Sequence, residues 1–210
     1  MMRKMMMVLW MVLATGLAMG TTPLKLDVGL STSGLEPGWQ RFISTDSGVT
    51  LYNGIKVTIT GTGTPGYRNR TSSALNGILN ELLWRDLVFA PTDTNLIVTI
   101  EGLFPNVKYE ISVGTFDIDS NTNAPRAADW KVGGETILTT SFGIPGVPIA
   151  TLVPSADRNY LFSGFATSDA TGKIVMQSAK AASSVGSPHA FINGLVIEPA
   201  LWADDPTPAN

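Results

Sequence analysis

Short segments in which apolar and polar residues alternate recur along most of the chain. The segments 24–28, 55–60 and 108–116 alternate clearly, and 95–100 is apolar at its centre. This alternation is typical of β-strands that bury one face. The same pattern, in weaker form, occurs at 49–52, 130–132, 135–139, 160–165, 173–177 and 190–198. Gly, Pro, Asn and Asp clusters separate the segments. About ten short, evenly spaced strands predict an all-β domain, either a β-sandwich or a jelly roll.

One segment follows a helical period instead. Its apolar residues are spaced three and four apart, so they fall on one helical face: Leu75, Ile78, Leu79, Leu82 and Leu83. Ser72 or Ser73 can cap the start of such a helix. We therefore predict one short helix over residues 73–84 that covers an edge or an end of the sandwich.

The N-terminal residues have the pattern of a targeting segment. Arg3 and Lys4 precede an apolar run over 5–17, and the small residues Ala18 and Gly20 flank Met19. This order predicts a secretory signal peptide over residues 1–20. The apolar run is shorter than the roughly 20 residues that a membrane helix requires. We expect a secreted or cell-surface protein with no membrane span after signal cleavage.

The C-terminal residues resemble a linker. Residues 201–210 contain a Pro-Thr-Pro sequence, which favours an extended chain. The sequence thus predicts a β-sandwich domain over 21–200 that further domains of a longer parent chain follow. A frayed natural terminus is the alternative.

Composition narrows the chemistry that the domain can carry. The chain has no cysteine and one histidine, which excludes disulfides, thiolate nucleophiles and Cys-ligated metal centres. Its formal charge of −3 becomes −5 without Arg3 and Lys4, and this acidity argues against nucleic acid as a partner. An exported domain without disulfides favours a bacterial source.

Several short motifs resemble the galactose-binding-domain-like jelly rolls of secreted bacterial multidomain proteins, including malectin-like domains. The resemblance covers most of residues 24–200. It rests on the opening strand 24–29 with Glu-Pro-Gly-Trp at 36–39, Arg-Asp-Leu-Val-Phe at 85–89, Gly-Leu-Phe-Pro at 102–105 before Tyr109, and Ile-Asn-Gly-Leu-Val-Ile-Glu at 192–198. It implies a jelly-roll fold and, by analogy, binding of a polysaccharide or other glycan. It supplies no ligand residues.

Candidate ligand residues follow from the chemistry of sugars. Sugars present apolar C–H faces beside hydroxyl groups, so their sites combine an exposed aromatic ring with hydrogen-bonding groups. The best such loop is 66–70, in which Tyr67, Arg68 and Asn69 lie together, and Trp130 beside Asp129 is the second candidate. A half-buried packing role is the alternative for both aromatic residues.

Two groups of oxygen donors suggest a structural Ca²⁺. Oxygen ligands alternate at Asp117, Asp119, Asn121 and Asn123, in the spacing of the first half of an EF-hand loop. The loop lacks the glycine and the terminal glutamate of that motif, and a polar turn is the alternative. Jelly-roll carbohydrate-binding modules also hold calcium between their first and last strands, where Asp27 and Glu198 are the available donors.

Catalytic motifs are weak in this sequence. His189 stands alone, and no G-x-S-x-G elbow or phosphate-binding loop occurs. Arg85 and Asp86 are adjacent and suggest a structural ion pair. We therefore expect a non-catalytic carbohydrate-binding domain. The alternatives are a structural or adhesive module without a small ligand, in which Tyr67 and Trp130 are buried or apart, and a hydrolase or lyase with a deep cleft at His189 or at two close carboxylates.

Overall fold

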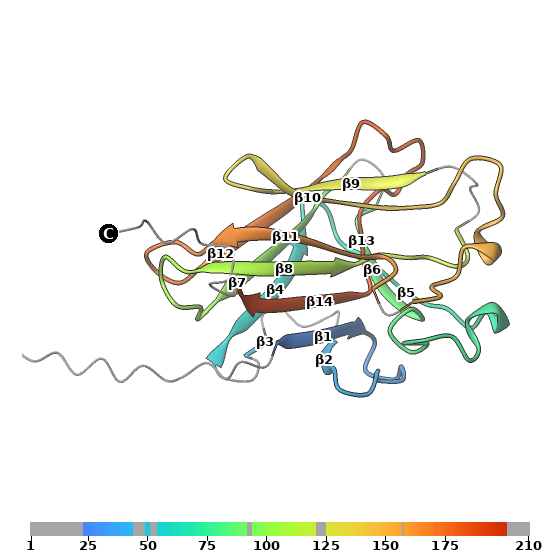
Figure 1. The fold of residues 1–210 in the computed structure, drawn as a ribbon, viewed down its shortest axis with the longest axis horizontal. Helices are drawn as coiled ribbons and strands as arrows, with labels where there is room; N and C mark the ends of the chain where they lie inside the picture. Colours follow the sequence, from blue (N-terminus) through green and yellow to red (C-terminus); the bar gives the residue numbers. More distant parts are fainter. Residues whose placement is uncertain are drawn as a thin grey trace, which may run out of the picture.

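A five-stranded sheet forms one layer of the molecule. The computed structural model describes residues 23–43, 49–50, 54–91, 94–120, 125–156 and 158–200, so the predicted signal peptide and tail lie outside it. The strands lie side by side in Figure 1, in an order that brings the first and last strands of the chain together. The order is β11 (Leu161–Thr167), β8 (Lys108–Gly114), β14 (Gly194–Pro199), β1 (Leu24–Gly29) and β2 (Gln40–Ile43). β1 and β2 pair in parallel, and the other neighbours pair antiparallel.

A six-stranded antiparallel sheet forms the second layer. Its order is β10 (Glu135–Phe142), β9 (Arg126–Val132), β12 (Ile174–Lys180), β7 (Leu96–Glu101), β4 (Lys56–Gly61) and β3 (Val49–Thr50). β7 shows why these residues form strands, because Leu96, Val98 and Ile100 are buried while the residues between them are only half-buried.

The main core lies between the two sheets. It combines inward-facing residues of the five-stranded sheet, such as Leu26, Ile111 and Leu195, with those of the six-stranded sheet, such as Val98 and Met176. Apolar faces of two sheets that pack together in this way define a sandwich. The fold is therefore all-β, of the predicted jelly-roll class.

A small third sheet closes one end of the sandwich. It consists of β13 (Phe191–Ile192), β6 (Asp86–Phe89) and β5 (Gly66–Asn69). A second buried cluster of Trp84, Phe116, Phe142 and other residues packs beside it. This cluster extends the core into the segment that connects β5 to β6.

The predicted helix over 73–84 is much shorter in the structure. A 3-10 helix, η2 (Ser73–Leu75), begins where Ser72 caps it, but turns follow up to residue 85. Gly77 and Asn80 have positive φ angles of 74° and 56°, a backbone conformation that a right-handed helix does not contain. A further 3-10 helix, η3 (Ile149–Thr151), lies between β10 and β11. Among the described residues, no helix has the length and apolar character that a membrane crossing requires.

Candidate functional site

On the outward face of the five-stranded sheet, residues from distant parts of the sequence form rows that run across the strands. In each row, antiparallel pairing sets one residue of a strand directly opposite one of the next strand. The central row consists of Ser163, Ser112, Val196 and Lys25, from β11, β8, β14 and β1 in turn. Ser112 Oγ lies 2.7 Å from Ser163 Oγ, so the row begins with a pair of hydrogen-bonded hydroxyl groups.

Two glycines in the neighbouring row allow a covering segment to pack on the sheet. Gly114 and Gly194 lie opposite each other on β8 and β14. A Cβ atom on Gly194 would stand only 2.8 Å from Cζ3 of Trp39 and 2.7 Å from Cδ1 of Leu83. Bare backbone at this point therefore lets Trp39 and Leu83 lie directly against the sheet.

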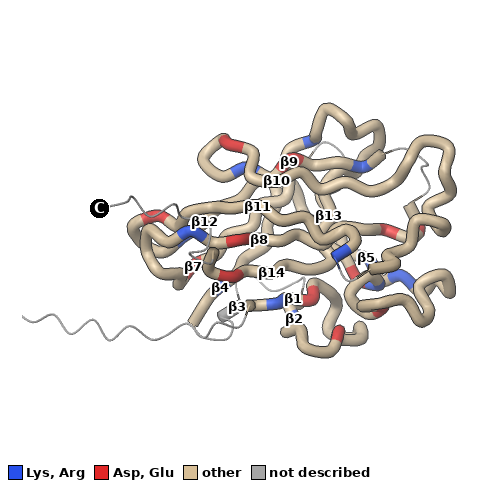
Figure 2. The backbone as a smooth tube through the Cα atoms, in the orientation of Figure 1, with Lys and Arg blue, Asp and Glu red and all other residues tan. Residues whose placement is uncertain are grey.

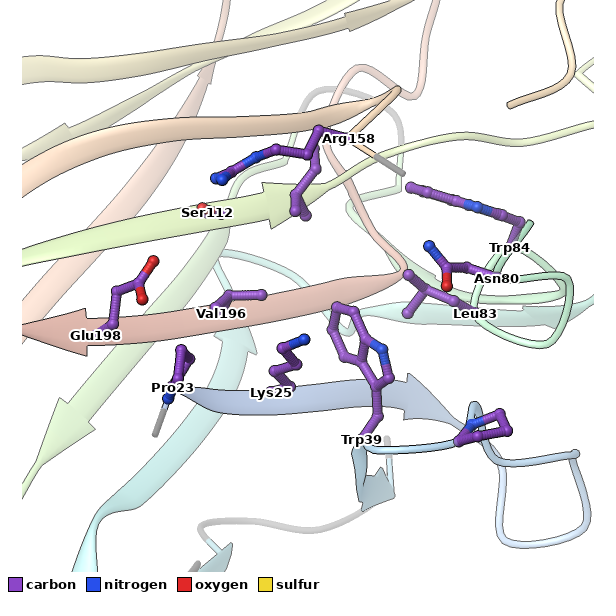
Figure 3. A pocket seen from close by; sticks show the side chains of 12 residues that line it. Pro23, Lys25, Trp39, Asn80, Leu83, Trp84, Ser112, Arg158, Val196 and Glu198 are labelled. Atoms are coloured by element: carbon purple, nitrogen blue, oxygen red, sulfur yellow. The ribbon is translucent and has the colours of Figure 1, made fainter. Parts of the chain in front are cut away.

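The covering residues end before the central row and leave a hollow beside it. The hollow holds about 300 Å³, at the small end of the range for ligand sites. Ser112 and Val196 form its floor, and Trp39, Lys25 and Arg158 stand around it (Figure 3). It is lined by Pro23, Lys25, Pro37, Trp39, Asn80, Leu83, Trp84, Ser112, Arg158, Leu161, Val196 and Glu198.

Trp39 supplies an aromatic surface at this hollow. Its side chain is half-buried, and Nζ of Lys25 lies 5.9 Å from the ring centroid, within the range of a cation–π interaction. Figure 3 shows the ring rising from the sheet between Lys25 and Leu83. An indole in this position offers an apolar face beside a hydrogen-bond donor.

Charged groups of both signs surround the hollow. Glu198 on β14 lies directly opposite Glu110 on β8. Figure 2 shows acidic positions in red on both strands. Because like charges in this arrangement repel, a cation near them is stabilising. Arg158 supplies it, with Nη2 3.6 Å from Oε1 of Glu110 and 3.4 Å from Oγ of Ser163. The site thus presents both donors and acceptors of charge-assisted hydrogen bonds.

The loop that carries Trp39 is fixed at several points. The Glu36 amide donates to Oδ2 of Asp27 at 2.8 Å, and the Glu36 carboxylate accepts from the amide of Leu82 at 3.0 Å. Arg41 donates to the carbonyl oxygens of Leu30 and Ser33 at 2.7 and 2.8 Å. These bonds join the loop to β1, to β2 and to the segment before β6, so Trp39 is held in place before any ligand arrives.

Two buried carboxylates lie beneath this loop. Asp27 and Asp86 are 2% and 1% exposed, and Oδ1 of each has no hydrogen-bond partner. Burial raises the pKa of Asp27 from 3.8 to about 7 and that of Asp86 to about 6, and the charge of Asp86 adds to the effect on Asp27. The Glu36 amide and Arg41 oppose the rise at Asp27.

The structure divides the predicted ligand residues. Trp130 is fully buried in the main core, with Nε1 3.3 Å from Oγ1 of Thr140, so it offers no surface to a ligand. The reason is that β9 begins at residue 126 rather than 130, which places Trp130 on the inward row of a longer strand. The loop predicted at 66–70 is mostly strand β5, where Tyr67 is half-buried against the core.

Arg68 and Asn69 remain exposed but bind within the protein. The Arg68 guanidinium lies 4.5 Å from the ring centroid of Phe89, and Asn69 Nδ2 donates to Oγ of Ser33 at 3.0 Å. Tyr67, Arg68 and Asn69 alternate along a strand, so successive side chains point to opposite faces. They therefore do not form one continuous surface with Trp130.

The predicted calcium ligands form an ion pair instead. Asp117 is 2% exposed and accepts from Nε and Nη2 of Arg70 at 2.7 and 2.8 Å, and Nη1 of Arg70 lies 3.4 Å from Asp119. The guanidinium stands where a cation bound to Asp117 would stand. Asn121 and Asn123 lie outside the described residues. Among those described, no group of three or more His, Asp or Glu residues could hold a metal. Two of the four predicted donors are thus engaged by Arg70, and calcium at 117–123 stays a prediction.

The other predicted pairings are also absent from the structure. Asp27 lies opposite Gly194 and Leu24 opposite Ile197, so Asp27 and Glu198 are four residue positions apart along the sheet, about 13 Å. Arg85 pairs with Glu81 at 2.6 Å rather than with Asp86, whose side chain points inward. His189 is buried, not placed in a cleft.

Comparisons with known proteins leave the family open. No family model and no curated protein matches the chain. Among solved structures, it is similar to the CBM36-1 domain of a multidomain xylanase from the hindgut metagenome of Trinervitermes trinervoides. The identity is 18% over 69% of this chain and 98% of that one, with a TM-score of 0.32.

Two further similar structures belong to larger proteins. An exo-beta-1,3-galactanase from Phanerochaete chrysosporium, solved with galactose, is 10% identical over 67% of this chain and 29% of its own, with a TM-score of 0.31. The bacteriophage CBA120 tailspike protein 4 is 16% identical over 68% of this chain and 18% of its own, with a TM-score of 0.26. The neighbours thus include a carbohydrate-binding module, part of a galactanase and part of an enzymatically active tailspike domain, and at these TM-scores the likeness carries no argument about the site.

Proposed function

We propose that this chain is a non-catalytic carbohydrate-binding domain that holds its ligand in the hollow on the outward face of the five-stranded sheet. The observation that carries the proposal is the position of Trp39, a half-exposed indole at the edge of a hollow of about 300 Å³. Lys25, Arg158 and Glu198 surround the same hollow. An aromatic face with convergent donors and acceptors is the combination that a sugar requires.

The proposed mechanism uses each group according to its chemistry. The C–H face of a sugar unit packs on the Trp39 ring, and the Lys25 ammonium, which lies over that ring in the free protein, moves to donate to a sugar hydroxyl. The Glu198 carboxylate accepts hydrogen bonds from sugar hydroxyls, and Arg158 donates to sugar oxygens. Because the loop that carries Trp39 is already fixed, binding requires little ordering of the protein.

The setting of this binding site is part of the same proposal. The signal-peptide pattern at 1–20 and the linker-like tail at 201–210 support an exported domain, secreted or at the cell surface, within a longer parent chain. In that setting the domain would hold a polysaccharide near the rest of the parent protein.

A second candidate function is a structural or adhesive module without a small ligand. The burial of Trp130 and the packing of Tyr67 against the core favour it, because the aromatic residues most visible in the sequence serve the fold. It assigns no role to the hollow at Trp39.

Affinity gel electrophoresis on soluble polysaccharides, including xylan and galactan, separates the two candidates. The full chain without its signal peptide is compared with Trp39→Ala and with Glu198→Gln, which removes a charge and keeps the shape. Arg68→Ala is the matched control, because Arg68 is exposed and belongs to the β5 region. We expect retardation by one class of polysaccharide, lost in Trp39→Ala, weakened in Glu198→Gln and unchanged in Arg68→Ala.

Two results would contradict the proposal. If no polysaccharide retards the chain, the structural or adhesive function gains support. If Arg68→Ala abolishes retardation and Trp39→Ala does not, the ligand binds at β5. Circular dichroism of each variant establishes that loss of binding is not loss of folding.

A further inference from the structure

A second exposed aromatic residue lies on the same face of the sheet as the hollow. Phe165 on β11 is 46% exposed and lies directly opposite Glu110 on β8. Nζ of Lys108 is 4.7 Å from the centroid of its ring. A single exposed apolar side chain is ordinary on a protein surface, so the case for Phe165 rests on its place on the same outward face as the hollow.

Phe165 and Trp39 have the same local arrangement at opposite sides of the sheet. Each ring has a lysine ammonium near its centroid, Lys108 for Phe165 and Lys25 for Trp39. Phe165 and Lys25 are separated by three strand spacings across the sheet and by one row along it, which corresponds to about 16 Å. Several consecutive sugar units would span that distance, and a single unit would not.

Polar groups fill the face between the two aromatic residues. Glu110 lies opposite Phe165 on one side and opposite Glu198 on the other, and Glu198 lines the hollow. Arg158 approaches both Glu110 and Ser163. Hydrogen-bonding side chains therefore follow one another along the path from Phe165 to Trp39.

The charges along this path identify the kind of ligand. The path carries three cationic side chains, Lys25, Lys108 and Arg158, and two carboxylates, Glu110 and Glu198. With the two signs nearly balanced and interleaved, the attraction of a strongly charged chain to one set of groups is offset by repulsion from the other set. Hydroxyl groups both donate and accept, so a neutral polyhydroxylated chain can satisfy both signs.

We infer that Phe165 is a second contact point of the same binding surface, and that the ligand is an extended segment of a neutral polysaccharide lying across β11, β8 and β14 to Trp39. This inference rests on the proposed function and adds to it the length and charge of the ligand. Phe165 would contact sugar units that lie beyond those held in the hollow.

Calorimetric titration with oligosaccharides of increasing length tests the inference. The probes are disaccharides, tetrasaccharides and hexasaccharides of the xylan, cellulose and galactan series. For the native chain we expect affinity to rise at least about tenfold from disaccharide to hexasaccharide in one series, because each added contact contributes free energy. Phe165→Ala should abolish most of this rise and leave the disaccharide affinity unchanged.

Val175→Ala is the matched control. Val175 is 42% exposed on β12 of the other sheet, so its truncation removes exposed apolar surface from a strand without touching this face. The inference would be overturned if short and long oligosaccharides bind with equal affinity, or if Phe165→Ala leaves the increase of affinity with length intact. In both cases the hollow would remain a sugar site. Tighter binding of the acidic polysaccharide pectate than of any neutral series would overturn the assigned charge class. Absence of binding to every probe would contradict the proposed function itself.

Discussion

Two regions of this molecule contain chemistry suited to binding, and they differ in how the sequence encodes them. The β5 region and the segment after β8 carry their polar residues close together in the sequence, at 66–70 and 117–119. In the structure these polar groups bond within the protein: Asn69 donates to Ser33, and Arg70 joins the two segments through Asp117. The hollow takes its residues from four strands, from three connecting segments and from Pro23 before β1.

The difference shows which polar residues remain available to a ligand. A compact polar motif at the end of a sheet can satisfy its own hydrogen bonds, and Arg70 with Asp117 does so while both are largely buried. Side chains that alternate on neighbouring strands point outward and parallel, so Lys25 and Glu198 stay open to solvent. We therefore assign stability to the first region and binding to the second.

The largest effect on stability should come from the Arg70–Asp117 pair. Asp117→Asn leaves Arg70 without its buried counter-charge and should lower the free energy of unfolding by about 3 kcal/mol. Polysaccharide affinity of the folded variant should not change. Urea denaturation and affinity electrophoresis measure the two quantities. Asp119→Asn, whose side chain is 45% exposed, is the control and should cost less than about 1 kcal/mol. If the folded Asp117→Asn variant loses affinity for the polysaccharide, the assignment of stability to the first region and of binding to the second is wrong.

Gly194→Ala should combine a moderate loss of stability with loss of binding. The added Cβ meets Trp39 and Leu83 within 2.8 Å, so the covering segment has to shift, at about 1–3 kcal/mol. Because Trp39 moves, polysaccharide affinity should fall at least about tenfold. In Gly66→Ala the new Cβ would lie 2.3 Å from the Phe89 ring, a similar conflict in the β5 region. Gly66→Ala should therefore lose stability and keep its affinity for the polysaccharide. If Gly66→Ala and Gly194→Ala lose equal affinity, the binding site is not confined to the hollow.

The buried pair Asp27 and Asp86 predicts an unusual pH dependence. Both pKa values lie above the ordinary 3.8, so the folded state binds protons more tightly than the unfolded state. The free energy of unfolding should therefore fall as pH rises from about 5 to about 7.5, by on the order of 2 kcal/mol. The pKa values of Glu81 and Asp169 are lowered by hydrogen bonds to their carboxylates, so these two groups act in the opposite sense, chiefly below this window.

Asp27→Asn isolates the contribution of this pair. The asparagine oxygen can still accept from the Glu36 amide, while the charge is removed. Urea denaturation at pH 5 and at pH 7.5 should show a smaller decrease in stability for the variant than for the native chain. A native chain that is equally or more stable at pH 7.5 would show that these carboxylates are not destabilised by burial.

Calcium should have the smallest effect. Because Arg70 already bonds to both oxygens of Asp117, excess calcium and a chelator should give the same Tm in thermal denaturation. A rise in Tm with calcium that Asp119→Asn removes would mean that the ion competes with Arg70, and that the 117–123 segment binds metal as its spacing suggests.

The sequence predicted most of the fold and little of the candidate site. Segments 24–28, 95–100 and 108–116 correspond to β1, β7 and β8, although β8 ends at Gly114, because alternation reports burial of one face directly. The helix at 73–84 was overestimated, since Gly77 and Asn80 break it after one turn. β2, β5 and β6 were missed, because short strands at the edge or the end of a sandwich take their stability from tertiary contacts rather than from their own pattern.

The hollow was missed for a different reason. Lys25 and Glu198 stand on strands that were predicted correctly, and the alternation already places both on the outward face. What the sequence does not contain is the order of the strands, which brings β1 beside β14 and β14 beside β8. Gly194, opposite Gly114, was the available signal, because bare backbone on an outward face leaves room for another element to approach.

Mapping backbone amide shifts by NMR, while the isotope-labelled chain is titrated with the polysaccharide that retards it best, tests the central claim most directly. We predict that the largest shifts occur at Lys25, Trp39, Ser112 and Val196, around the hollow, and that β5 stays unchanged. Largest shifts at residues 66–70, with none on the outward face of the five-stranded sheet, would contradict the account.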